Sequence, residues 1–263
     1  MDPALRAAAS GMIAQQTRME VISNNLSNVN TTAYKRRRAH FEDLLYQTEQ
    51  AASNVDFQNN RTQPEVQVGR GTRLASVKRI NSQGSIRQTG RPLDVAIEGD
   101  GFFQVRKGDG TVAYTRDGSF RISDQGTLVT TSGYEVLPGI NVPRDAREIS
   151  ISRTGIVTAR TGGAGTEPME IGRIELARFP NSTGLKALGE NLYAETSNSG
   201  APQLGTPDSR GFGQLRSGAL ESSNVEIVRE MTNMISAMRA FEIGSKAIQS
   251  SQEMSQITSQ MMR

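Results

Sequence analysis

The sequence predicts an α+β protein, with long N- and C-terminal helices packed together as a coiled-coil-like base and a mainly β central body. Near each terminus, apolar residues recur at alternating steps of three and four, which is the spacing of a helical seam. Between these segments, short apolar runs alternate with clusters of Gly, Asp, Ser and Asn, as in strands joined by tight turns. A seam along a whole helix needs a partner of similar length, and each terminal segment offers one to the other.

The first helix has a readable beginning and end. Asp2 can cap the first free amide groups, and Pro3 suits the first helical position, where its missing N–H costs nothing. Asn-rich chain from residue 24 to 32 competes for backbone hydrogen bonds, so we expect a helix from about Pro3 to about Leu26. The seam residues expected at a subunit interface are Leu5, Met12, Met19, Ile22, Leu26 and Val29.

The middle of the chain indicates strands and loops. Residues 93 to 137 predict short strands separated by turns, and a hairpin is expected across Ile149 to Ala159 with its turn at Thr154-Gly155. A further strand is expected from Ile171 to Phe179, and residues 161 to 166 form a flexible loop at an outer tip. Two stretches look irregular. Residues 47 to 70 are either an extended arm or a loop that becomes ordered only on assembly, and residues 198 to 213 are a return linker.

The last helix is expected from Ser223, because Ser223 and Glu226 have capping-box spacing, almost to Arg263. Its seam drifts between its two halves, and Gly244 lies where the register changes, so a bend or a switch of neighbour is expected there. The expected interface residues are Val228, Met231, Ile235, Met238, Phe241, Ile248, Met254 and Ile257. The alternative is that these residues only fill a core, since Met packs adaptably.

These elements predict three parts. Residues 1–34 plus 222–263 form a terminal helical domain, 35–80 form an extended arm and linker, and 81–221 form the mainly β body with its return linker. Because the chain leaves a helical base and returns to it, both termini are expected at the same end.

Composition argues against catalysis. The chain of 263 residues has one His and no Cys, which excludes thiolate zinc sites, disulfides and a thiol nucleophile. Gly99-Asp100-Gly101 lacks the strand–loop–helix context of a phosphate-binding loop, and Asp124-Gln125-Gly126 lacks the later glutamate of a calcium loop. We therefore expect no enzyme, cofactor, metal or small-molecule substrate.

Charge does not indicate nucleic acid, because 30 basic residues are almost balanced by 27 acidic ones. The basic run Lys35-Arg36-Arg37-Arg38 is expected to be a solvated or subunit-facing patch, with Arg36 or Arg38 meeting Glu42 or Asp43 of a neighbouring copy. No apolar run is long enough to span a bilayer, and the first residues lack the order of a secretory signal, so a protein of this sequence that leaves the cytoplasm is expected to leave by another route.

Several segments, in order along nearly the whole chain, closely resemble bacterial flagellar basal-body rod and hook proteins. They are residues 24–31 (NNLSNVNT), 41–47 (FEDLLYQ), 101–105 (GFFQV), 114–120 (YTRDGSF), 189–196 (GENLYAET), 220–225 (LESSNV), 239–242 (RAFE) and 246–248 (KAI). The sequence departs from the family pattern at Ala33, where relatives often have Gly, and at Met238, Phe241 and Gly244.

The resemblance implies a non-catalytic axial subunit that polymerises helically into a hollow, rigid rod and transmits torque from motor to hook. Length and the 41–47 segment favour the distal rod; a proximal rod or hook subunit, or a secreted fibre or adhesin subunit, is the alternative. The terminal helices would form the inner rod core, and the 47–70 arm would add contacts that distinguish a straight rod from a bendable hook. Implied partners are further copies, proximal rod subunits, the hook protein, the surrounding ring proteins and the flagellar export apparatus. The implied location is the basal-body rod across the periplasm, reached without a cleavable signal peptide.

Overall fold

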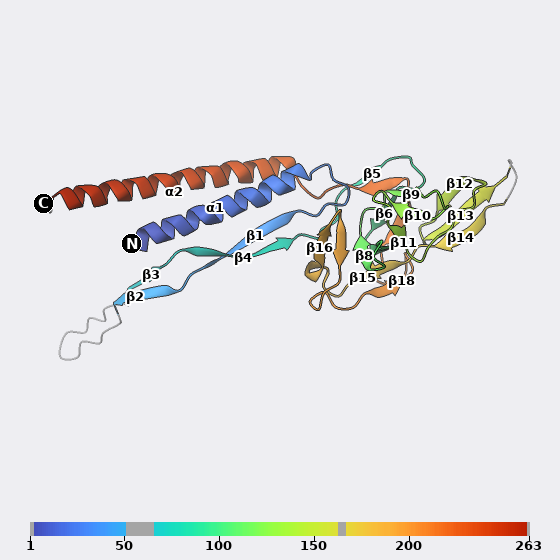
Figure 1. The fold of residues 1–263 in the computed structure, drawn as a ribbon, viewed down its shortest axis with the longest axis horizontal. Helices are drawn as coiled ribbons and strands as arrows, with labels where there is room; N and C mark the ends of the chain where they lie inside the picture. The colour runs from blue at the N-terminus through green and yellow to red at the C-terminus, as the bar shows by residue number, and fades with distance from the viewer. Residues whose placement is uncertain (1–2, 51–65, 163–166, 262–263) are drawn as a thin grey trace. The chain divides into compact units, whose positions relative to one another are not determined.

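The computed structural model describes residues 3–50, 66–162 and 167–261. It confirms an α+β chain whose N- and C-terminal helices pack against each other and whose central part is mostly β. The chain divides into two compact units. Unit 1 consists of Met1–Ser27, Arg37–Arg79 and Glu226–Arg263, and unit 2 consists of Asn28–Arg36 and Ile80–Val225. The chain therefore passes between the units four times (Figure 1).

Unit 1 is built from helices and a long antiparallel ribbon. Helix α1 (Pro3–Ser27) packs against α2 (Ile227–Met261) and also against β1 (Arg37–Asp43) and β4 (Thr72–Arg79), which pair with each other (Figure 1). The expected first helix is thus confirmed to within one residue at its C-terminal end. Beyond β1 and β4, β2 (Tyr46–Gln50) pairs with β3 (Val66–Gly69). The ends of the arm, expected to be irregular, are therefore two paired antiparallel strands, and its middle lies outside the described residues.

Small residues let α1 approach both neighbours closely. At Gly71, before β4, φ is 112°, and a Cβ atom there would lie 2.2 Å from the Ser10 Oγ of α1. The same hydroxyl accepts a hydrogen bond from the Thr72 backbone N–H at 3.2 Å. At Gly244 of α2, a Cβ atom would lie 2.9 Å from the Met12 Cγ. Both glycines thus mark places where α1 contacts another element with no room for a side chain.

Unit 2 holds a series of short strands, as expected for residues 93 to 137. Its strands are β5 (Ile86–Gln88), β6 (Val95–Glu98), β7 (Phe102–Arg106), β8 (Val112–Thr115), β9 (Phe120–Ile122), β10 (Leu128–Thr130), β11 (Glu135–Val136), β12 (Ala146–Ile151), β13 (Ile156–Thr161), β14 (Met169–Arg173), β15 (Leu176–Arg178), β16 (Lys186–Gly189), β17 (Leu192–Ala194), β18 (Gln203–Gly205), β19 (Gln214–Ser217) and β20 (Ala219–Glu221). A short 3-10 helix, η1 (Ser182–Gly184), precedes β16.

The strands of unit 2 form several sheets. One runs in the order β16-β17-β8-β7-β11-β10-β9, and β15 joins it by pairing with β7 and with β18. A second sheet has the order β12-β13-β14, while β19 pairs with β6 and β20 with β5. Their inner faces bury one apolar cluster around Phe103, Phe120 and Leu176. A second cluster gathers Phe102, Tyr114, Phe179 and Tyr193, whose rings meet edge to face.

The hairpin expected across Ile149 to Ala159 is confirmed as β12 and β13, with Gly155 at the turn and φ of 83°. The single strand expected from Ile171 to Phe179 is wrong. It is two strands in different sheets, β14 and β15, because the Ile174 N–H donates to the Gly155 carbonyl and the chain then turns to pair Leu176 with Phe103. Likewise, the return linker contains β18, which pairs with β15. Most of the expected tip loop, residues 163–166, lies outside the described residues.

The last helix begins later than its capping-box spacing predicts, at Ile227 instead of Ser223. The Ser223 hydroxyl accepts from the Val225 N–H, not from the third helical amide. Asn224 has other partners: its side-chain oxygen accepts from the Arg36 N–H at 2.8 Å, and its amide donates to the Ile80 carbonyl at 2.9 Å. These long-range bonds hold the chain just before α2 in a non-helical conformation, so residues 222–226 form no helical turn.

Candidate subunit interface

Helix α2 has one row of residues that faces α1. The row recurs at steps of three and four and comprises Glu230, Met234, Ala237, Phe241, Gly244 and Ile248, all buried or half-buried. The side-chain amide of Asn25 in α1 donates a hydrogen bond to Glu230. The same amide donates to the Arg37 carbonyl and accepts from the Arg37 N–H, both at 2.8 Å. This polar contact lies at the end of α1, where it links α1, α2 and the start of β1.

The predicted interface residues of α2 fall into two groups. Phe241 and Ile248 belong to the row that faces α1, so they contribute to packing within the chain. The others are exposed: 78% for Val228, about half for Met231, Ile235 and Met238, 67% for Met254 and 56% for Ile257. Large apolar side chains in such a row are costly to leave in water, and continuous apolar stripes of this kind mark binding surfaces.

The exposed residues of α2 form two stripes. We call Ile227, Val228, Met231, Ile235 and Met238 the proximal stripe, and Ile243, Ala247, Met254, Ile257 and Met261 the distal stripe. Ile227, Ile243 and Met261 were not predicted as interface residues. The signal for Ile243 and Met261 was present in the sequence, because Ile243, Ala247, Met254, Ile257 and Met261 continue the steps of three and four once Ser250 is counted.

The predicted residues of α1 are less exposed. Ile22 is buried and Leu5, Met12, Met19 and Leu26 are half-buried, while Val29 belongs to unit 2 and is half-buried there. Ile13 of α1, which was not predicted as an interface residue, has 66% of its surface exposed. Met19 and Met234 also line a shallow groove of about 500 Å³ between α1 and α2, together with Glu20, Ser23, Asn24 and Ser27. Its mixed lining suits a side chain of another protein better than a small molecule.

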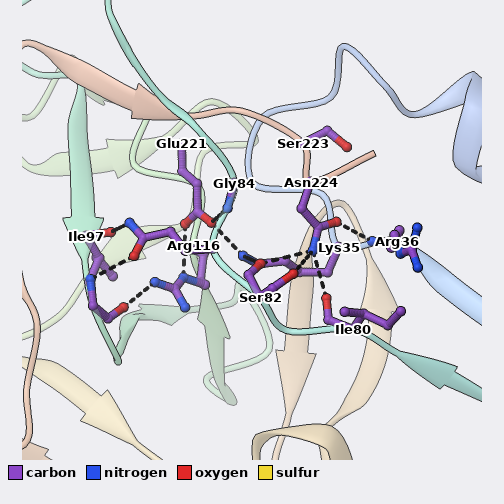
Figure 2. A network of polar contacts seen from close by, with 12 residues as sticks. Lys35, Arg36, Ile80, Ser82, Gly84, Ile97, Arg116, Glu221, Ser223 and Asn224 are labelled. Atoms are coloured by element: carbon purple, nitrogen blue, oxygen red, sulfur yellow. Dashed lines mark hydrogen bonds and ion pairs between the residues drawn. The ribbon is translucent and has the colours of Figure 1, made fainter. Parts of the chain in front are cut away.

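Within unit 2, a buried charge network joins segments distant in sequence (Figure 2). The Lys35 ammonium lies 2.5 Å from Glu221 and donates to the Ser82 carbonyl at 2.8 Å. Glu221 also accepts from the Gly84 N–H at 2.8 Å and forms an ion pair with Arg116 at 3.1 Å. Arg116 donates to the Gly99 carbonyl and lies over the Phe102 ring. Lys35, Arg116 and Glu221 are each at most 6% exposed.

The network corrects part of the predicted basic patch. Lys35 is neither solvated nor subunit-facing, because it is buried with Glu221 of its own chain; a pair separated by 186 residues leaves no local pattern. Arg37 and Arg38 are exposed on β1. Glu42 forms an exposed ion pair with Arg73 across the β1–β4 ribbon at 3.2 Å.

Three further groups in unit 2 have shifted pKa values. Hydrogen bonds from Thr111 lower the pKa of Asp109 in the turn before β8, and a hydrogen bond with Glu190 raises the pKa of Tyr134. Burial raises the pKa of Tyr114 in the aromatic cluster. Over residues 3–50, 66–162 and 167–261, His, Asp and Glu form no group of three or more that could hold a metal ion. Neither described helix is long and apolar enough to cross a membrane.

Family models match three parts of the chain. The model described as flagella basal body rod protein matches residues 5–35, the flagellar hook protein FlgE/F/G D1 domain matches 96–159, and the flagellar basal body rod FlgEFG protein C-terminal model matches 216–261.

Similar proteins cover the chain almost completely. The chain is 50% identical to the flagellar basal-body rod protein FlgG of Borreliella burgdorferi, over 99% of this chain and 98% of that one. In Caulobacter vibrioides, it is 48% identical to FlgG over 98% of both chains but 34% identical to FlgF over 97% of this chain and 96% of the other. The likeness is thus stronger to FlgG than to FlgF of the same organism.

Proposed function

Because the chain belongs to the flagellar basal-body rod protein family and is a structural subunit of the distal rod, we propose that its copies polymerise helically into a hollow, rigid tube that transmits torque from motor to hook. The observation that carries this proposal is the proximal stripe of α2. Four of its residues at steps of three and four remain half or more exposed although α1 packs along the same helix. Such a stripe is the side of a helix that a further helix covers.

The subunit interface of this proposal combines both terminal helices. Val228, Met231, Ile235, Met238, Met254 and Ile257 of α2 contact neighbouring copies, whereas Phe241, Ile248 and the half-buried residues of α1 hold α1 and α2 in the geometry that neighbours recognise. In the assembled rod, α1 and α2 form a coiled-coil-like base. Intersubunit seams along packed helices give stiffness, because bending the tube must slide close-packed side chains past one another.

The three parts of the chain have different roles in this proposal. Residues 1–34 plus 222–263 form the inner rod core, the arm within 35–80 adds contacts between copies, and 81–221 form the outer body that turns inside the rings. The exposed Leu45, at 88%, and Tyr46, at 57%, support a contact role for the arm. Arg36 or Arg38 of one copy forms an ion pair with Glu42 or Asp43 of another. Where Glu42 is the partner, it gives up its exposed ion pair with Arg73 of its own chain.

The partners beyond further copies follow from the rod position. We place proximal rod subunits at one end of the tube, the hook protein at the other, and ring proteins around it. Delivery is by the flagellar export apparatus to a rod that crosses the periplasm. A chain without Cys has no disulfide to resolve before or after such transit.

Electron cryo-microscopy of the concentrated full-length chain, with and without isolated rod ends as templates, tests this function. Straight tubes with a central channel are expected. Ile235→Asp places a charge in the proximal stripe and is expected to abolish tube growth, with the circular dichroism of the monomer unchanged. Its matched control is Ser236→Asp, which adds the same charge at the next exposed position, off the stripe.

Met19→Asp, in the groove between α1 and α2, is expected to abolish tubes as well. A wild-type chain that grows neither alone nor on rod ends, or tubes of normal length from both the Met19 and Ile235 variants, would contradict the proposed function.

A further inference from the structure

We propose that the distal stripe of α2 in one copy packs in parallel along the proximal stripe of α2 in the next copy, so that α2 provides both halves of one repeated axial contact. This inference rests on the proposed polymerisation and names its contact. Both stripes lie on unit 1, and both are apolar rows of the same helix.

The two stripes match in spacing. Val228, Met231, Ile235 and Met238 follow steps of three, four and three, and in the distal stripe Met254, Ile257 and Met261 follow steps of three and four. In a parallel pairing, Val228, Met231 and Ile235 therefore lie opposite Met254, Ile257 and Met261. The offset between the two helices is about 26 residues, or roughly 39 Å at the helical rise.

The partner must be a second copy. The two stripes are successive parts of one continuous helix, Ile227–Met261, of 35 residues and about 52 Å in length. They cannot reach each other within a chain, and α1 lies along another row of α2, the one that holds Ala237 and Gly244. An α2 segment from another copy brings apolar side chains at the same spacing, and at this offset residues 253–261 of one copy lie along residues 227–235 of the next.

The geometry also explains an open polymer. Two different surfaces of one subunit that bind each other make a heterologous contact, and such contacts repeat indefinitely unless the rotation closes a ring. Each pairing involves only three apolar side chains from each copy, so it buries far less than the roughly 1,200 Å² that stable complexes bury. A single axial contact should therefore leave the free chain monomeric, while the neighbours in a tube add enough contacts for growth.

Disulfide trapping tests this pairing, because the chain contains no Cys of its own. In Met231→Cys/Ile257→Cys, the two sulfurs of one chain stand far beyond the roughly 7 Å Cα separation that a disulfide allows. Oxidation of assembled tubes is then expected to give a ladder of linked chains of three or more copies on non-reducing gels. Ile235→Cys/Met261→Cys has the same offset and should give the same ladder if the first variant does not assemble.

Ser236→Cys/Ile257→Cys is the matched control, since Ser236 is exposed but lies off the proximal stripe. It is expected to assemble and to stay mostly monomeric on the same gels. Mixing the Met231→Cys chain with the Ile257→Cys chain should give linked dimers and no longer species. Normal tubes without a ladder from both stripe variants, or an equal ladder from the control, would overturn the pairing and leave the rod function standing. No tubes from any chain on rod ends would overturn both.

Discussion

Glu221 shows how one buried residue can hold several segments. Its carboxylate accepts from Lys35 and from the Gly84 amide and faces Arg116, so three stretches of unit 2 meet at one group. We expect Glu221→Gln to lower the free energy of unfolding by about 3–5 kcal/mol, because two buried cations lose their counter-charge. Lys35→Met should lower the free energy of unfolding by less, because Glu221 keeps its ion pair with Arg116. Urea unfolding of the monomeric chain measures both changes.

The matched control is an exposed pair in the same unit. Arg160 and Glu148 lie 3.0 Å apart, with 45% and 66% of their side chains exposed, so Arg160→Gln should change the unfolding free energy by less than about 1 kcal/mol. Equal losses from Arg160→Gln and Glu221→Gln would show that burial of the network contributes nothing.

Ala33 occupies a backbone conformation that suits glycine. Its φ is 56°, it is 1% exposed, and its N–H donates to the Glu221 carbonyl at 2.8 Å, which fixes the turn after α1. A left-handed conformation costs a residue with a Cβ about 1–2 kcal/mol, whereas a glycine loses about 0.4–1 kcal/mol through unfolded-state entropy. Ala33→Gly is therefore expected to raise the melting temperature slightly. A fall in melting temperature would mean that the methyl group contributes packing that outweighs the strain.

At the scale of elements, the contact between α1 and the β1–β4 ribbon depends on Gly71. A Cβ there would lie 2.2 Å from the Ser10 Oγ and 3.2 Å from the Ala7 Cα, and φ of 112° disfavours any side chain. Gly71→Ala should therefore destabilise unit 1 by about 1–3 kcal/mol. Faster amide hydrogen exchange in β1 and β4, but not in β12 and β13, would be the direct readout.

Gly90 offers the comparison for that variant. It also has positive φ, 73°, but nothing lies within 4 Å of a Cβ atom built there. Gly90→Ala carries backbone strain without the clash, so a loss as large as that of Gly71→Ala would show that the close approach to α1 is unimportant.

The sequence predicted those elements whose limits depend on local chemistry. Pro3 and the Asn-rich run bound α1, and Gly155 makes the β12–β13 turn, because capping and positive φ act within a few residues. It failed where distant groups decide. The Asn224 side chain forms hydrogen bonds with the backbones of Arg36 and Ile80, so α2 begins later than predicted. The Gly155 carbonyl accepts a hydrogen bond from the Ile174 N–H, so β14 ends before the predicted strand does. No local sequence pattern predicts hydrogen bonds between residues so far apart in the chain.

The sequence predicted which residues of α2 form apolar rows, but not which row packs against α1 and which rows stay exposed. Apolar steps of three and four describe both the row of α2 that packs on α1 and the rows that stay exposed. Phe241 and Val228 therefore looked alike in the sequence. Their different roles come from where α1 lies, which the polar link of Asn25 with Glu230 and the contact of Gly244 with Met12 help to define.

At the scale of the whole molecule, unit 2 should fold without α1 and α2. A fragment of residues 28–225 keeps the apolar clusters and the complete Lys35–Glu221–Arg116 network. We expect it to be monomeric, with a cooperative thermal transition and β-type circular dichroism. A fragment of residues 70–220 loses both Lys35 and Glu221 and should melt at a lower temperature. Equal melting temperatures of the two fragments would show that the Lys35–Glu221–Arg116 network does not stabilise unit 2.

The four passages of the chain between the units also set an order in time. Unit 1 takes segments from the beginning, the early part and the end of the chain, and α2 follows every strand in sequence. If the proposed export delivers the chain from its N-terminus, neither stripe of α2 can form until nearly all of the chain has arrived, and α1 has no α2 to pack against until then. On that route, association through the two stripes of α2 is the last contact that a subunit can make during its delivery.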